Sequence, residues 1–104
     1  DAGHLAVAGE RFPLAASIVG PYLKLVAIKD MAKVWDEQAV PRRIRFEQRP
    51  LSTGDLEMAA VVDHLRATGF DGVVSMHVEY DGTTEELIAG GRRDYAILRR
   101  MLRP

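Results

Sequence analysis

His77 and Glu79 are the two side chains whose types and spacing are best suited to chemistry. They stand two residues apart near the carboxyl end of a run rich in β-branched residues, 72–80, so on a strand both would point to the same face. Binding sites of parallel sheets gather at that end. The pair could bind a metal ion or move a proton. The alternative is that His77 is a hydrogen-bonded interior group and that Glu79 simply leaves the strand for solvent.

Lys29 and Asp30 form a second polar pair, at the end of the apolar run 23–29. At the carboxyl end of a strand they could bind a substrate, and Lys33, three residues further on, would be within reach of an anionic ligand. The commoner alternative for such a pair is a local ion pair at the rim of the fold.

Asp1 and His4, at the start of the chain, have a spacing compatible with one shared polar site. A terminal Asp is by default frayed and solvated. On the residues alone, the solvated state is the preferred interpretation of Asp1.

The elements that would position these side chains can be read from the hydrophobic pattern. The two apolar runs predict buried strands. Helical spacing and capping residues predict three helices, at roughly 13–19, at 55–68 and after Thr83. The order strand, helix, strand, helix predicts an α/β protein with parallel strands. Two or three parallel strands would leave open edges, which indicates part of a larger fold.

The last helix begins with a capping box, Thr83 and Glu86. Gly90 and Gly91 weaken it, so two short helices are the alternative to one. The face expected to pack inward comprises Leu87, Gly91, Tyr95, Leu98 and Leu102. The segment 31–54 is long and polar, and we expect a loop there. A short extended piece at 45–47 is possible within it.

Composition excludes several classes of function. The 104 residues are 47% hydrophobic and 28% charged, and the net charge of −1 gives no electrostatic footprint for nucleic acid or an anionic membrane. No apolar run approaches the about 20 residues that span a bilayer. The absence of cysteine excludes disulfides and fits the reducing cytoplasm, the location that we expect. The first residues carry neither an initiator Met nor a signal pattern, so we expect the chain to start partway through a longer protein.

Taken in order, the short motifs of the chain resemble a known superfamily. They are Asp1-x-x-His4, Val26-Ala27-Ile28-Lys29-Asp30, Pro50-Leu51-Ser52-Thr53-Gly54, Gly69-Phe70-Asp71-Gly72 and Ser75-Met76-His77-Val78-Glu79-Tyr80. Their order and spacing resemble the C-terminal third of the xylose isomerase-like, sugar phosphate isomerase/epimerase superfamily. The resemblance covers nearly the whole chain, and its most specific parts are the Lys29-Asp30 exit and the Gly69-Phe70-Asp71-Gly72 entry to the last strand.

The resemblance implies an α/β fold made of the C-terminal βα units of a (β/α)8 TIM barrel, with parallel strands and flanking helices. Residues 1–104 would be one C-terminal fragment of a single barrel domain, because a whole barrel needs about 250 residues. The fragment alone would be inactive, and the full-length protein could form a homo-oligomer.

The resemblance also implies a site. In that superfamily a divalent metal (Mn²⁺, Mg²⁺, Co²⁺ or Zn²⁺) at the barrel mouth polarises substrate oxygens while carboxylates move a proton. The implied metal ligands are Asp1 and His77, the implied catalytic residues are His77 and Glu79, and the implied residues that bind the sugar or sugar phosphate are His4, Lys29 and Lys33. Asp1 and His4 would end the sixth strand of the barrel.

Two positions depart from the pattern of that superfamily. Ala27 stands where the seventh strand should present a metal-binding His, and His77 stands where the eighth should present a Glu. Either the metal site is rebuilt around Asp1, His77 or Glu79 and an upstream Glu, or metal chemistry has been lost.

The leading hypothesis is part of a metal-dependent sugar or sugar-phosphate isomerase/epimerase that transfers a proton next to a carbonyl. A polyol dehydratase on the same scaffold is a close alternative, whereas the near-neutral charge argues against the DNA repair nucleases that share the scaffold. Ala27 favours another alternative, a non-catalytic sugar-binding barrel. A small independent α/β module that merely echoes barrel motifs is the remaining one.

Overall fold

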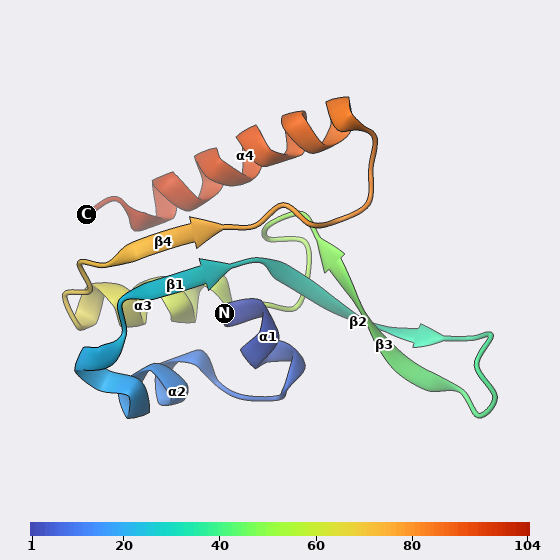
Figure 1. Cartoon of the computed structure of the whole chain (residues 1–104), viewed down its shortest axis with the longest axis horizontal. Coiled ribbons are helices and arrows are strands. Elements are labelled where there is room, and N and C mark those ends of the chain that lie inside the picture. The colour runs from blue at the N-terminus through green and yellow to red at the C-terminus, as the bar shows by residue number, and fades with distance from the viewer.

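The computed structural model describes all 104 residues and is a mixed α/β structure with a small parallel sheet, a β-hairpin and flanking helices (Figure 1). Its elements in chain order are α1 (Ala2–Val7), α2 (Phe12–Val19), the 3₁₀ turn η1 (Gly20–Tyr22), β1 (Leu25–Ile28), β2 (Asp30–Asp36), β3 (Arg43–Arg49), α3 (Met58–Ala67), β4 (Val73–Met76) and α4 (Thr84–Leu102). Strands β1 and β4 run parallel, and β2 and β3 form an antiparallel pair. The two predicted parallel strands and the three predicted helices are present, with the strands shorter than their apolar runs, whereas α1, β2 and β3 were not predicted.

The core lies against one face of the β1–β4 sheet. Val26 and Ile28 are buried there, and Val74 and Met76, their register partners, pack against the same cluster. The alternation of side chains along a strand puts these four residues on one face, as the pattern predicts. Helix α3 covers that face with its apolar residues, namely Met58, Val61, Val62 and Leu65.

The opposite face of the parallel sheet is partly uncovered. Leu25 and Val73 are register partners at the start of the two strands, and their exposed fractions are 54% and 60%. Neither strand has a third strand beside it. Parallel sheets are normally covered on both faces, so a two-stranded sheet with an exposed apolar pair is an incomplete layer. No helix in the structure has the length and apolar character needed to cross a membrane.

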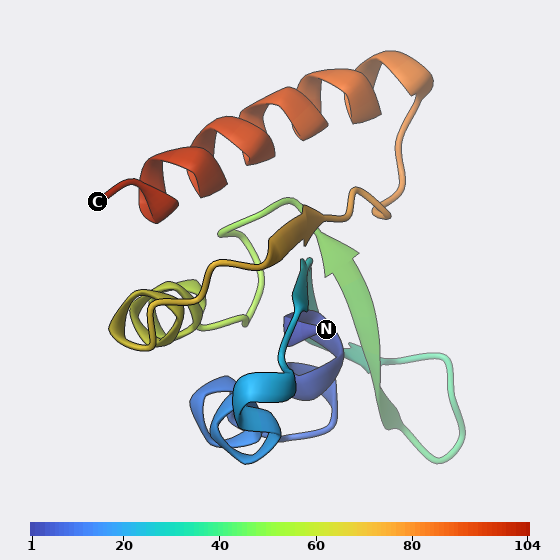
Figure 2. The ribbon, with the colours of Figure 1, turned by 60° about the vertical axis from the view of Figure 1, so that its left-hand side comes forward.

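The β2–β3 hairpin corrects the expected loop at 31–54. Seven residue pairs join the two strands, from Asp30 opposite Arg49 to Asp36 opposite Arg43, and the hairpin extends away from the rest of the chain (Figures 1 and 2). The alternation of polar and apolar residues from Arg43 to Glu47, in β3, was the available signal. The prediction of a loop was wrong because polar side chains on an exposed hairpin look like loop composition, while the backbone pairing that makes the strands is not visible in the residues.

Helix α4 is one continuous helix of 19 residues, and its capping box is present as predicted. The alternative of two short helices at Gly90 and Gly91 is therefore wrong. Of the expected inward face, Leu98 is buried and Leu87, Gly91 and Leu102 are half-buried, but Tyr95 is 56% exposed. Gly90 and Asp94 are buried in addition. The reason is a buried polar contact of Asp94, described below.

Asp30 anchors the hairpin to the rest of the fold. Its carboxylate is buried and accepts three backbone N–H hydrogen bonds, from Met31 at 2.9 Å and from Gly54 and Leu56 at 3.0 Å each. Glycine fits at position 54, because a Cβ there would overlap the Asp30 carboxylate. Asp30 therefore makes neither a substrate contact nor an ion pair with Lys29, and instead fixes where the chain returns after β3.

Replacing Asp30 by Asn is expected to lower the free energy of unfolding by about 2–4 kcal/mol, because hydrogen bonds to a charged acceptor are strong and buried N–H groups left without partners are costly. An amide offers one oxygen and would turn its own N–H groups toward at least one donor. Urea denaturation followed by circular dichroism measures the change. Asp63→Asn is the matched control, because the Asp63 side chain is exposed on a helix and makes no hydrogen bond. This substitution should change the free energy of unfolding by less than about 0.5 kcal/mol. Equal effects of both substitutions would contradict the anchoring role.

Candidate functional site

Lys29 is the centre of a polar network at the carboxyl ends of β1 and β4. Its Nζ donates to Glu79 Oε2 at 3.1 Å and lies 3.6 Å from Asp1 Oδ2. Only 7% of the Lys29 side chain is exposed. Residues that are distant in the sequence thus meet around one buried ammonium group.

Glu79 has a partner for each of its oxygens. Oε2 accepts from Lys29 and from Gln48 Nε2 at 3.0 Å, and Oε1 lies 3.0 Å from His77 Nδ1. The hydrogen bond from Lys29 is the largest cause that lowers the pKa of Glu79 below 4.5, with desolvation acting in the opposite direction. Glu79 is therefore ionised at neutral pH, and its side chain remains 42% exposed.

His77 and Glu79 lie beyond the end of β4, not within it as the apolar run 72–80 suggested. The His77 N–H still donates to the Ile28 carbonyl at 2.9 Å, which continues the pairing of the parallel strands by one residue. This bond holds His77 beside Lys29 at the end of β1. The two predicted catalytic residues therefore share one side of the site.

Asp1 and His4 lie at the start of α1, which corrects the expectation that they end a strand. The Asp1 carboxylate caps the helix by accepting the His4 N–H at 2.9 Å, and its other oxygen lies 3.4 Å from His4 Nδ1. Asp1 is not frayed, because its side chain is only 20% exposed and faces Lys29. Gly3 permits this approach, since an added Cβ would overlap the backbone and side chain of Lys29.

Lys33 stands apart from this network. It lies on β2 with an exposed side chain, and its backbone N–H donates to Asp55 Oδ2 at 2.7 Å. The structure therefore brings together five of the six predicted site residues, namely Asp1, His4, Lys29, His77 and Glu79.

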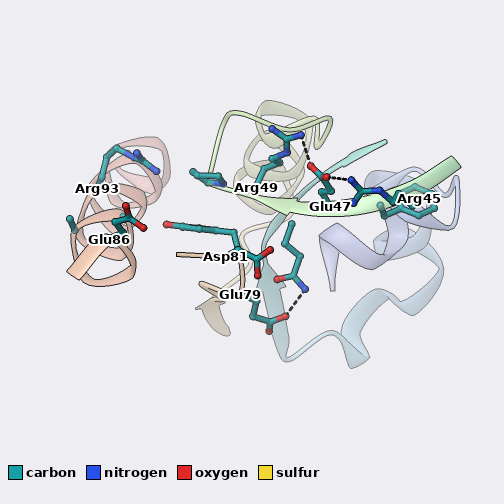
Figure 3. Close-up of a pocket in the computed structure, with 13 residues that line it drawn as sticks. Arg45, Glu47, Arg49, Glu79, Asp81, Glu86 and Arg93 are labelled. Carbon is teal, nitrogen blue, oxygen red and sulfur yellow. Dashed lines mark hydrogen bonds and ion pairs between the residues drawn. The ribbon is translucent and has the colours of Figure 1, made fainter. Parts of the chain in front are cut away.

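An open cleft of about 940 Å³ borders the network between β3, the segment after β4 and the first half of α4 (Figure 3). Both signs of charge line it: the acidic residues Glu47, Glu79, Asp81 and Glu86, and the basic residues Arg45, Arg49 and Arg93. Glu47 pairs with Arg49 and Arg45, so part of this charge is already neutralised. A polar ligand such as a sugar could reach Glu79 from this cleft.

Gln48 and the pair Tyr80–Asp94 belong to the site but were missed by the sequence reasoning. The Tyr80 hydroxyl donates to Asp94 Oδ2 at 3.0 Å, and Arg93 donates to the other oxygen at 2.9 Å. Burial is the largest cause that raises the pKa of Tyr80 above 10, followed by its hydrogen bond to Asp94. Asp94, four residues before Leu98 on an apolar face, was the available signal for this contact.

The expected metal site does not fit this arrangement. The Lys29 ammonium lies between the Asp1 and Glu79 carboxylates, where a shared cation would have to lie. Ala27 offers no ligand atom, and nowhere in the chain do three His, Asp or Glu side chains gather to hold a metal ion. Metal ligands need lone pairs that converge on one point, whereas the oxygens here face partners within the protein.

No family model matches this chain, and no curated protein sequence matches it. The resemblance to the sugar isomerase/epimerase superfamily therefore rests on the motifs of the chain itself. The structure contributes the placement of those motifs around Lys29, and a functional assignment has to be argued from that site.

The Lys29–Glu79 contact predicts that the stability of the fold depends on pH. Because the pKa of Glu79 is lower in the folded chain than its ordinary value of 4.5, its ionised form stabilises the fold above pH 4.5, and this contribution is lost as the pH falls through the folded pKa. A carboxyl ¹³C titration should therefore give Glu79 a midpoint below 4.5 in the wild type and a higher one in Lys29→Met. Lys33→Met, the matched control, should leave the midpoint unchanged; a wild-type midpoint at or above 4.5 would contradict the contact.

Substitution by alanine at the two neighbouring glycines of α4, Gly90 and Gly91, should have opposite effects on stability. A Cβ at Gly90 would overlap the Tyr80 hydroxyl, whereas one at Gly91 would meet Val78 Cγ2 at 3.4 Å, an ordinary contact. Gly90→Ala should destabilise the chain by about 1–3 kcal/mol through overpacking. Gly91→Ala should stabilise it by up to about 1 kcal/mol through helix propensity. Thermal and urea melts measure both, and a stabilising Gly90→Ala would show that Tyr80 does not lie against the helix.

Proposed function

We propose that this chain supplies the C-terminal βα units of a sugar or sugar-phosphate isomerase/epimerase of the (β/α)8 barrel type. The observation that carries the proposal is the network around Lys29. Asp1, Glu79 and His77 reach it from the start of α1 and from the segment after β4. Active sites of such barrels are built at the carboxyl ends of parallel strands, which is where these residues meet.

The sheet supports the same proposal. Strands β1 and β4 are adjacent and parallel, each is followed by a segment that leads to a helix, and the β2–β3 hairpin is inserted after β1 on the side of the site. In a barrel, further strands would pair with the free edges and cover Leu25 and Val73. The hairpin would then be an enlarged loop at the active-site end.

The chemistry supports proton transfer next to a carbonyl. Glu79 is ionised at neutral pH, partly exposed and bordered by an open cleft, so it is placed to accept a proton, although its lowered pKa makes it a weaker base than an ordinary Glu. His77, 3.0 Å from Glu79, is placed to receive or return a proton. Lys29 would bind a substrate oxygen and stabilise the negative charge that develops on it.

One observation favours a second candidate, a barrel that binds sugars without converting them. Glu79 has three protein partners in the structure, and Ala27 replaces the metal-binding His of the related enzymes. A base held in this way would bind hydroxyl groups and leave carbon-bound protons in place. A polyol dehydratase on the same scaffold would use the same residues and differ in its product.

The test is hydrogen exchange on a panel of ketoses and ketose phosphates in D₂O, with the native polypeptide that carries this chain. Exchange of the proton next to the carbonyl, followed by ¹H NMR, should occur with the wild type and fall by at least about 100-fold in Glu79→Gln, as is typical for loss of a general base. Glu10→Gln, at an exposed position whose side chain makes no hydrogen bond, is the matched control and should keep full activity. Binding of a sugar without exchange would select the non-catalytic candidate, and neither binding nor exchange would refute both.

A further inference from the structure

The carboxylates of Asp1 and Glu79 are bridged by a cation that belongs to the chain itself. The Lys29 ammonium lies 3.1 Å from Glu79 and 3.6 Å from Asp1, and its side chain is nearly buried. The Lys29 side chain is held by its burial, whereas 42% of the Glu79 side chain stays exposed, so water screens part of this ion pair.

The remaining lone pairs of the two carboxylates are directed at other donors. At Glu79 they meet Gln48 and His77, and at Asp1 they meet the His4 N–H and lie near the His4 ring. A divalent metal would have to displace the ammonium and break several of these contacts. It would also bring two positive charges next to Lys29, with no other partner nearby for the lysine.

We infer that the Lys29 ammonium occupies the place of a divalent cation, so that this site holds a built-in positive charge and binds no metal. An ammonium has three N–H groups; one donates to Glu79 at 3.1 Å, and Asp1 forms an ion pair with the group at 3.6 Å. A further N–H group is left for an oxygen of the ligand, a carbonyl, hydroxyl or phosphate oxygen. This assignment rests on the proposed function for the identity of the ligand, but not for the exclusion of metal.

Removal of the ammonium would leave the two carboxylates that it now bridges without their shared cation. Without it, the Asp1 and Glu79 carboxylates would face one space with two negative charges and no cation between them. Carboxylate oxygens and water are ligands that Mn²⁺ accepts. Replacing Lys29 by an apolar residue of similar length should therefore convert the site into a metal site.

Isothermal titration with MnCl₂, in the absence of any sugar, tests the inference. The wild type and the control Lys33→Met should show no saturable binding of Mn²⁺ up to about 1 mM. Lys29→Met should bind one Mn²⁺ with a Kd at least about tenfold below that limit, a gain of about 1.4 kcal/mol. Adding Asp1→Asn to Lys29→Met should abolish the binding. Circular dichroism verifies that each variant is folded.

Stoichiometric binding of Mn²⁺ by the wild type that is lost in Asp1→Asn would overturn the inference. So would a folded Lys29→Met that binds no better than the wild type. If Lys29→Met does not fold, line broadening of the His4 and His77 ring resonances by Mn²⁺ in the wild type decides alone: selective broadening of both rings refutes the inference, and its absence supports it. None of these results depends on a sugar, so a failure of the proposed isomerase function would be seen separately, in the exchange experiment.

Discussion

The hydrogen bonds of one buried carboxylate, that of Asp30, tie the β2–β3 hairpin and the segment before α3 to the end of β1. Three backbone N–H groups from two segments converge on it, and they fix both where β2 begins and where the chain turns back toward α3. Because α3 in turn covers the core face of β1 and β4, the anchor at Asp30 also fixes the sheet. A single charged group can do this because a carboxylate accepts several strong hydrogen bonds at once and is costly to bury without them.

Asp30 and its neighbour Lys29 make different kinds of contact at the end of β1. Successive side chains leave a strand on opposite sides, so Asp30 serves the backbone while Lys29 joins the Asp1 and Glu79 carboxylates. The buried ammonium links helix α1 to the segment after β4, two parts of the chain that share no strand pairing. The interaction that gives the site its charge also holds its two sides together.

The sequence singled out five residues that the structure brings together, but it mispredicted some of the elements around them. Polar side chains at the ends of apolar runs marked His77, Glu79 and Lys29, and strand alternation placed Val26 and Val74 on one core face. The hairpin was missed because backbone pairing depends on the partner strand and not on residue type alone. Asp94 was missed because a charge on an apolar face is explained only by its partner, and Tyr80 lies 14 residues earlier in the chain.

The sequence by itself determined the two parallel strands with their core faces, the helices α2, α3 and α4, and the capping box of α4, because these follow from local periodicity and local hydrogen bonding. The tertiary structure alone decided that Lys29 lies between Asp1 and Glu79, although 50 residues separate Lys29 from Glu79. It also decided that Lys33 lies outside the site. The physical reason is that an ion pair between distant residues depends on where folding places their backbones, and no local pattern carries that information.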